Sequence, residues 1–253
     1  MRRIALSRLI LLVGLLAAWE LWARHGDPLL YVPPSRVIPA LFRLLRLEAY
    51  PALPGHFALT MFEVLVAYAL AAGLGLALGF ALGLPRHVGE IYEPLLSACY
   101  AIPSVVWYPS LMLFFGLGPA SKIAFGVLLG FFPVVLAVLA GLRSVDPNLL
   151  TVSRALGARS GTCFVKVVLP AITATLVAGL RAGLALTVVG VLVGEILGAR
   201  RGLGYLINYT YGFFRTADYA ALALLALALV LVVDAIAAWT ESRARRWTEG
   251  ATA

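Results

Sequence analysis

The sequence predicts an all-α integral membrane protein with about six transmembrane helices. Hydrophobic residues make up 62% of the 253 residues and charged residues only 13%, which is far from the composition of a soluble domain. Several apolar runs reach the length of about 20 residues that a helix needs to cross a bilayer. The 24 glycines fit the same class, because small residues let membrane helices approach one another closely.

The first predicted span covers residues 4–23. Its Met-Arg-Arg start is similar to that of a signal peptide, but the apolar run is longer than a usual signal core and lacks a small-x-small cleavage site. We therefore expect a membrane helix with its N-terminus inside. Residues 24–57 are rich in proline and have room for one short amphipathic helix, residues 35–47, on the outer surface, with Ser35 as its N-cap.

Residues 58–84 form the second predicted span. Gly75, Gly79 and Gly83 give two successive small-xxx-small pairs, a spacing typical of close helix packing in membranes. A short polar turn on the inner side, residues 85–94, is expected to follow.

The third predicted span, residues 95–115, is interrupted by Pro103 and Pro109. Broken helices are tolerated within a membrane where they are packed in protein or line a cavity. The two prolines therefore indicate a cavity-lining segment, and a plain proline kink is the alternative. Residues 116–121 form an outer turn.

The fourth, fifth and sixth predicted spans are residues 122–142, 171–198 and 219–239. Arg181 and Glu195 lie in the fifth and Asp234 in the sixth, and an ionisable residue within a membrane is a functional hypothesis by default. The alternative for Arg181 is a structural pairing with an acid or with backbone carbonyls. Glu195 cannot be its neighbour on the same helix, because 14 residues correspond to about 21 Å of rise. Pairing at helix ends is favoured for both acids.

The net charge of +8 is explained by the positive-inside rule. Both termini and the central polar loop carry more of the lysines and arginines than the predicted outer segments, so both termini are predicted to be cytoplasmic. The outer segment 200–218 has tyrosines and phenylalanines, which suit a membrane interface. Cys99 and Cys163 are expected to be free thiols. We find no catalytic or metal-binding constellation.

The stretch from Leu142 to Pro170 is the longest polar interruption in the second half of the chain. Its first part has apolar residues on helical spacing, namely Leu149, Val152 and Leu156. Gly157 follows, where a helix commonly ends in a left-handed residue. A second short run, residues 160–168, is expected to end at Pro170, which cannot donate to a continuing helix. The pattern favours two short amphipathic helices docked on something other than lipid, and a loop lying on the headgroups is the alternative.

This loop resembles the "EAA" loop of ATP-binding-cassette importer permeases, whose pattern is Glu-Ala-Ala, three residues, Gly, nine residues and Ile-x-Leu-Pro. Gly157 is followed by nine residues and then by Val167-Val168-Leu169-Pro170, so the second half matches with Val for Ile. Thr151-Val152-Ser153 stands at the Glu-Ala-Ala positions, and the family's leading acid is missing.

The resemblance extends over about residues 58–239. Phe115-Gly116-Leu117-Gly118 with Ser121-Lys122, and Glu195-Ile196-Leu197-Gly198 with Gly202-Leu203-Gly204-Tyr205, are similar to a permease group that serves nitrate, taurine and other sulfonates. That group has relatives for pyrimidine-type vitamin precursors. The resemblance implies a type I ABC importer permease fold with cytoplasmic coupling helices.

The resemblance also implies partners and a location. The chain is expected to be a non-catalytic permease in the bacterial plasma (inner) membrane, paired with a second permease copy as a homodimer. Two ATP-binding subunits would bind it inside, and an extracytoplasmic solute-binding protein would deliver the solute. ATP and magnesium would act on the partner ATPase, and this chain would bind no cofactor, metal or nucleic acid.

The apolar runs, the charges within them and the resemblance together give the following division of the chain and of its sites. Residues 1–57 form a membrane helix and an outer amphipathic segment, residues 58–240 the transmembrane domain with coupling loop 143–170, and residues 241–253 a basic tail. Residues expected to couple to the ATPase are Thr151, Ser153, Ala155, Leu156, Gly157, Ala158, Phe164, Val165 and Pro170. Residues expected on the translocation path are Pro103, Pro109, Arg181 and Glu195. A secondary transporter independent of ATP is the alternative from another class, but paired midplane charges or inverted repeats are not clear in this sequence.

Overall fold

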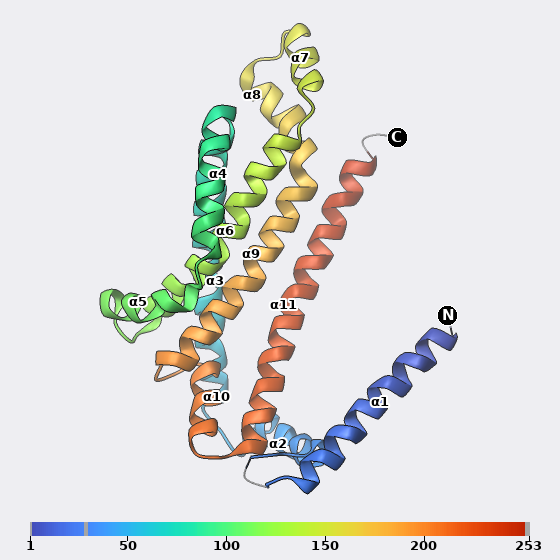
Figure 1. Cartoon of the computed structure of the whole chain (residues 1–253), viewed down its shortest axis with the longest axis vertical. Coiled ribbons are helices and arrows are strands. Elements are labelled where there is room, and N and C mark those ends of the chain that lie inside the picture. The colour runs from blue at the N-terminus through green and yellow to red at the C-terminus, as the bar shows by residue number, and fades with distance from the viewer. Residues whose placement is uncertain (1, 28–29, 251–253) are drawn as a thin grey trace. The chain divides into compact units, whose positions relative to one another are not determined.

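The computed structural model describes residues 2–27 and 30–250, with side chains for residues 6–8, 10–27, 30–85 and 87–239. Regular structure in these ranges is entirely helical (Figure 1). The elements are α1 Arg2–His25, α2 Pro34–Leu45, α3 Leu53–Gly83, α4 Arg86–Ala101, the 3₁₀ turn η1 Ser104–Trp107, α5 Tyr108–Phe115, α6 Pro119–Ser144, α7 Pro147–Ala155, α8 Ser160–Cys163, the π-helical segment η2 Phe164–Val168, α9 Leu169–Gly198, α10 Leu203–Gly212 and α11 Thr216–Gly250.

The predicted membrane helices are present. Five helices of the described chain are long and apolar enough to cross a membrane. The number is six if α4 and the η1–α5 segment, which form a bent pair, are counted as one span. The bend of 78° falls between Ala101 and Ser104, so the predicted interruption of the third span at Pro103 is confirmed. Pro109 lies in the first turn of α5, a position that proline fits without losing a helical hydrogen bond.

Contacts divide the chain into two units. The first comprises residues 1–60 and 195–229, and the second residues 61–194 and 230–253. The predicted boundaries after residues 57 and 240 stay predictions.

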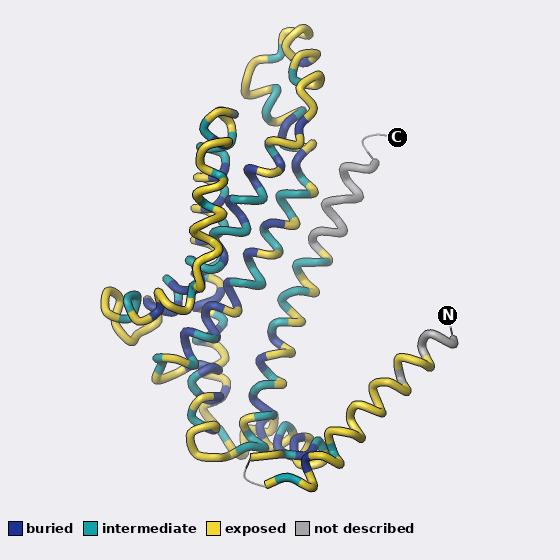
Figure 2. The backbone as a smooth tube through the Cα atoms, in the orientation of Figure 1, coloured by how far each residue is buried: buried dark blue, intermediate teal, exposed yellow. Residues whose placement is uncertain are grey.

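In the first unit, α1 exposes most of its side chains, which Figure 2 shows as a nearly continuous yellow tube. The start of α2 is tied to α1 through Glu20, whose carboxylate accepts from Ser35 Oγ at 2.7 Å and from the Ser35 backbone N–H at 3.0 Å. The prediction of Ser35 as N-cap is therefore wrong. Pro33 holds the cap position and Pro34 the first helical position, where its fixed φ suits the helix.

In the second unit, α6 packs closely against the helices α3 and α9. A Cβ added at Gly79 of α3 would lie 2.6 Å from Val138 Cβ, and one added at Gly130 of α6 would lie 2.0 Å from Thr187 Oγ1 of α9. The small-xxx-small spacing in α3 thus marks a true helix contact. The same device on α6 and α9 was not singled out from the sequence.

Two further predictions of local structure are wrong. Residues 86–94 are not a polar turn, because α4 starts at Arg86 with Pro85 at its N-cap, and Pro94 lies inside the helix. The run that begins at Ser160 does not end at Pro170 but continues to Gly198. The π-helical segment η2 comes immediately before the proline, and the Leu169 N–H bonds back five residues to the Phe164 carbonyl. This wider turn rearranges the hydrogen bonds next to the residue that lacks an N–H.

Candidate functional site

The start of α7 is built entirely from its own sequence. Asp146 stands at the N-cap in an extended conformation, and its Oδ1 accepts from the Asn148 backbone N–H at 2.8 Å. Pro147 occupies the first helical position, where a missing N–H costs nothing. The helix is short, so these two residues supply much of what fixes its direction.

The end of α7 is fixed by a Schellman motif around Gly157. Gly157 has φ +79°, its N–H bonds to the Arg154 carbonyl at 2.9 Å, and the Ala158 N–H bonds to the Ser153 carbonyl at 3.0 Å. This is the pattern in which a left-handed glycine satisfies the last carbonyls of a helix. The predicted glycine corner is confirmed.

One face of α7 packs inward. Val145, Val168 and Ile172 form a buried cluster, against which Leu150, Leu142, Cys163, Phe80 and Phe164 are partly buried. The Phe164 ring meets the Phe80 ring edge-on, with ring centres 5.4 Å apart. Ser153 is buried, and its Oγ lies 3.0 Å from Cys163 Sγ. These contacts hold α7 and the α8–η2 segment together as one compact tip.

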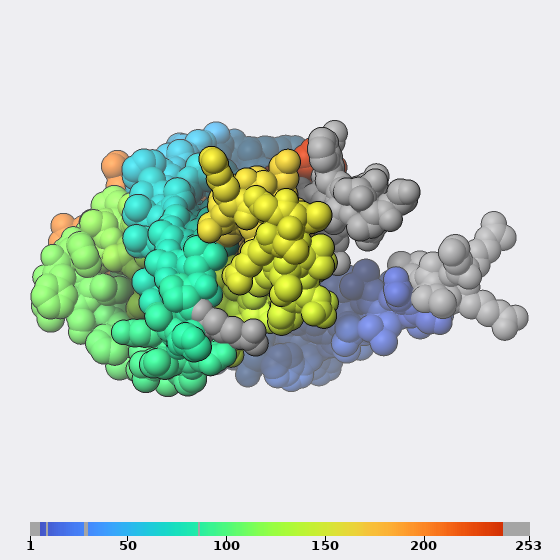
Figure 3. All heavy atoms as spheres, turned by 90° about the horizontal axis from the view of Figure 1, so that it is seen from above, coloured from blue at the N-terminus to red at the C-terminus, as the bar shows by residue number. Residues whose placement is uncertain are grey.

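The opposite face of α7 is apolar and exposed. Leu149 is 50% exposed, Val152 57% and Leu156 83%, and Val165 on η2 is 59% exposed. Figure 1 shows α7 beyond the ends of α6 and α9, and Figure 3 looks down on this tip, in yellow, beside α4. A rigid tip therefore carries an apolar stripe that its own unit does not cover.

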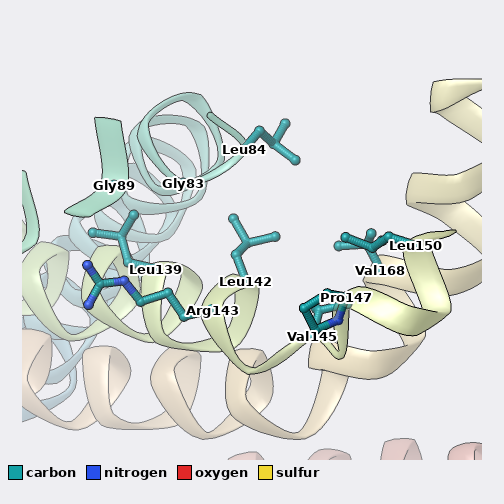
Figure 4. Close-up of a pocket in the computed structure, with 10 residues that line it drawn as sticks. All are labelled: Gly83, Leu84, Gly89, Leu139, Leu142, Arg143, Val145, Pro147, Leu150 and Val168. Atoms are coloured by element: carbon teal, nitrogen blue, oxygen red, sulfur yellow. The ribbon is translucent and has the colours of Figure 1, made fainter. Parts of the chain in front are cut away.

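An apolar pocket lies behind this tip (Figure 4). Its walls come from the α3–α4 turn, from α6 and from the inward face of α7, and the residues are Gly83, Leu84, Gly89, Leu139, Leu142, Arg143, Val145, Pro147, Leu150 and Val168. Arg143 at its edge forms an ion pair with Glu93 of α4 at 2.5 Å. The pair connects α4 to the end of α6 next to the loop.

The predicted coupling residues thus divide by exposure. Ser153 and Phe164 face their own unit, and Ala158 is half-buried. The exposed members are Thr151, Ala155, Leu156, Gly157, Val165 and Pro170. Thr151 Oγ1 donates to the Pro147 carbonyl at 3.0 Å, so its hydroxyl is satisfied within α7.

Arg181 of α9 makes a two-pronged ion pair with Asp234 of α11. Its Nε donates to Oδ1 and its NH2 donates to Oδ2, each at 2.8 Å. The two side chains are 36% and 41% exposed. The pair is planar and directional, the geometry in which arginine binds carboxylates best. Pairing of Arg181 with an acid was the alternative given from the sequence. The predicted helix-end pairing of Asp234 is wrong, because Asp234 lies in the middle of α11 and binds Arg181 of another helix.

Pro103 and Pro109, the other predicted path residues of this unit, are exposed on the bent segment. Between them Tyr108 is fully buried, and its hydroxyl donates to the Gly194 carbonyl at 2.6 Å. Nearby in the fold, Lys122 is 1% exposed and donates to the carbonyls of Leu117 and Gly118 at 2.6 and 3.1 Å. Tyr108 and Lys122 anchor the bent segment. Lys122 belongs to a motif that the resemblance had marked, without a role, whereas no sequence signal had marked Tyr108.

Glu195 lies near the end of α9 and is buried against the start of α10. Its Oε1 accepts from Thr60 Oγ1 and its Oε2 from the Gly204 backbone N–H, each at 2.7 Å. Thr60 Oγ1 accepts from the Leu203 N–H at 2.9 Å, and His56 Nδ1 accepts from the Gly202 N–H at 2.9 Å. A carboxylate at a helix N-terminus is stabilised by the orphan N–H groups and by the helix dipole. The contacts of Glu195 are those of a capping group, as favoured from the sequence.

Tyr50, Arg43 and Asp218 form a second polar cluster in the first unit. The Tyr50 hydroxyl donates to Asp218 Oδ2 at 3.3 Å, and Arg43 lies 3.7 Å from Asp218 Oδ1. Burial raises the pKa of Tyr50 above its usual value, so the phenol stays protonated and remains a donor.

The chain's similarity to known proteins agrees with this geometry. Residues 69–246 match the family described as binding-protein-dependent transport system inner membrane component. This chain belongs to that family. It is a multi-pass inner membrane permease of the ATP-binding-cassette importer type, and the family is one of transport proteins and not of enzymes.

Two curated relatives and one solved structure are informative. The taurine transport system permease of Escherichia coli is 29% identical over 83% of this chain and 78% of its own length. The formylaminopyrimidine transport permease of Halalkalibacterium halodurans is 31% identical over 79% of each chain. A chain of the MetNI methionine ABC transporter in inward-facing conformations superposes with a TM-score of 0.64 at 21% identity, covering 78% of this chain and 98% of that one. The predicted type I permease fold is confirmed.

Proposed function

We propose that this permease forms the translocation path for a small anionic or zwitterionic solute of the nitrate, sulfonate or taurine kind. It works as two copies with two separate ATP-binding subunits on the cytoplasmic side and a solute-binding protein outside. ATP and magnesium are bound by those partner subunits. Both termini lie in the cytoplasm, on the same side as α7.

The observation that carries the proposal is the exposed stripe on the capped tip. A lever that transmits force must be compact, and α7 is fixed by Asp146 at one end and by Gly157 at the other. It must also present a surface to its partner, and Leu149, Val152 and Leu156 are apolar side chains left uncovered in the described chain. Closure of the ATP-binding subunits would move this tip as a rigid body and open the path toward the outside.

The name of the taurine relative supports a sulfonate-like solute. Within the chain, the same class of solute is supported by Arg181, a cation in a span, oriented by Asp234. We assign Arg181 to the translocation path, with Pro103 and Pro109 shaping it. Glu195 acts on the path through α10, whose start it holds.

A second candidate is a pyrimidine-type vitamin precursor. The observation in its favour is the formylaminopyrimidine permease, which is as similar to this chain as the taurine permease is. A pyrimidine is bound mainly by stacking and hydrogen bonds and less by ion pairs. For such a solute, uptake should depend little on Arg181.

The coupling role is tested by placing a photo-crosslinking residue at position 156 in native membranes. We expect a product with an ATP-binding subunit, identified by mass spectrometry. The same residue at Leu113 of α5, which is 87% exposed but lies on another element, is the control and should give no such product. If position 156 reaches no ATP-binding subunit, the proposed function is wrong.

The solute role of Arg181 is tested by uptake assays on Arg181→Gln and Asp234→Asn. If Arg181 contacts a sulfonate, Arg181→Gln raises KM by about tenfold or more, the loss of one charge-assisted contact of about 1.5 kcal/mol. Asp234→Asn leaves the guanidinium charge in place. Its main effect should be a lower protein level, with only a small change in KM. Equal KM in both variants, with only protein level reduced, would leave Arg181 a purely structural residue.

A further inference from the structure

The tip that carries α7 is basic as well as apolar. Between Pro147 and Pro170 the sequence has the cations Arg154, Arg159 and Lys166 and no aspartate or glutamate. All three side chains are exposed. None of the ion pairs seen among the described side chains involves them, whereas Arg143, just before the tip, is paired with Glu93.

The tip has no acid to offer a partner. Asp146 is the nearest one along the chain, and its carboxylate already caps α7. The hydroxyl of Thr151, on the exposed side, donates a hydrogen bond to the Pro147 carbonyl. Beyond Asp146, a partner cation placed against this surface would meet only the like charges of Arg154, Arg159 and Lys166, which disfavours association.

The cations flank the apolar stripe. Arg154 is two residues from Leu156, Arg159 follows the Gly157 corner, and Lys166 is next to Val165. An apolar centre with a charged border is the usual anatomy of a protein interface, in which the border steers encounter and sets the partner's orientation.

We infer that the tip docks into a groove on the ATP-binding subunit that has an apolar floor and an acidic rim. The inference rests on the proposed function and adds the chemistry of the partner surface. The apolar floor receives Leu149, Val152 and Leu156, and carboxylates on the rim face Arg154, Arg159 and Lys166. Anionic lipid headgroups are the other surface that attracts such cations. The position of α7 beyond the ends of α6 and α9 favours the protein partner (Figure 1).

The test uses the full complex in lipid nanodiscs, with the photo-crosslinking residue at position 156 as the reporter of docking. The variant is Arg154→Gln with Arg159→Gln, and the control is Arg36→Gln, an exposed cation on α2. We expect the cross-link yield of the unaltered tip to fall by about fivefold between roughly 0.05 and 0.5 M salt, since screening weakens rim charges. The neutralised variant should start several-fold lower and respond little to salt, and the control should match the unaltered chain.

A charge exchange makes the assignment specific. Arg154→Glu should lower the yield further, and a carboxylate-to-lysine change on the partner's rim should restore it. If the neutralised variant cross-links to the ATP-binding subunit as well as the unaltered chain at every salt concentration, the acidic rim is wrong while the coupling role stands. A yield that follows the anionic lipid content of the nanodisc, and not the partner's charge, also overturns the inference. A cross-link that never reaches an ATP-binding subunit defeats the coupling role itself.

Discussion

The helices α7 and α10 begin in opposite ways. At the start of α7, Asp146 accepts a hydrogen bond from the Asn148 N–H, two residues further along the chain. The first N–H groups of α10 are served by His56, Thr60 and Glu195, of which two come from α3 and are more than 140 residues distant in sequence. One cap is local and exposed, whereas the other is distant and buried.

The difference separates a helix that its own sequence caps from a helix that distant residues hold in place. The outer face of α7 is uncovered in the described chain. In α10 the backbone donors, the capping side chains and the burial of Leu203 all bind the helix to its own unit. Changes at the α10 cap should therefore appear as lost stability, and changes at α7 as lost transport with the fold intact.

The largest effect is expected for Glu195→Ala. The substitution leaves the Gly204 N–H and the Thr60 hydroxyl without their buried carboxylate, at a cost of roughly 3 kcal/mol. Thermal unfolding of the purified protein in nanodiscs measures it. Glu195→Gln keeps an acceptor for Gly204 and should lose clearly less. Equal loss in the two variants would mean that the carboxylate fills space and does not cap α10.

Gly202→Ala should come next. Gly202 has φ +112°, and an added Cβ would lie 2.0 Å from Glu195 Oε1. With ψ 170°, Gly202 lies in a backbone region that is nearly restricted to glycine, so strain of about 1–3 kcal/mol adds to the displacement of a carboxylate that is held on both oxygens. We expect unfolding at a markedly lower temperature than in the unaltered protein. A near-normal unfolding temperature would show that the carboxylate moves aside without loss.

Gly157→Ala is the matched change at α7, and its effect should be smaller. Gly157 also has positive φ, at +79°, but an added Cβ meets nothing within 4 Å. Only the strain of about 1 kcal/mol remains. Gly157→Asn should recover part of it, because asparagine tolerates this conformation better than other residues. If Gly157→Ala destabilises as much as Gly202→Ala, the tip is packed against something that the isolated chain does not show.

The success of the sequence predictions also depends on whether the signal is local or distant in the chain. The spans, the glycine contacts of α3 and the Gly157 corner depend on residues close together in the chain, and all of them are confirmed. Arg181 and Glu195 could be named because charges in apolar runs are rare. Asp234, the partner of Arg181, and Thr60, one of the two partners of Glu195, lie 53 and 135 residues away and carry no local signal.

The wrong predictions have a common cause in proline. Pro94 was interpreted as the end of a polar turn and Pro170 as the end of a short helical run, yet α4 continues through the first and the helix from Ser160 continues past the second. At Pro170 the helix continues because the wider turn of η2 rearranges the hydrogen bonds next to the residue that lacks an N–H.

The smallest change in stability is expected for Asp146→Ala. This variant also separates the effect on stability from the effect on transport at α7. The cap is exposed and supplies one hydrogen bond, so its loss should cost about 1 kcal/mol or less. Transport should fall by more than this predicts, because a frayed α7 no longer moves as one body with the α8–η2 segment. Asp146→Ser keeps a capping oxygen and should restore uptake while removing the charge. If Asp146→Ala transports normally, the tip does not need a fixed helix start. The Gly157 corner and the inward packing of Leu150 would then be sufficient to keep the tip rigid.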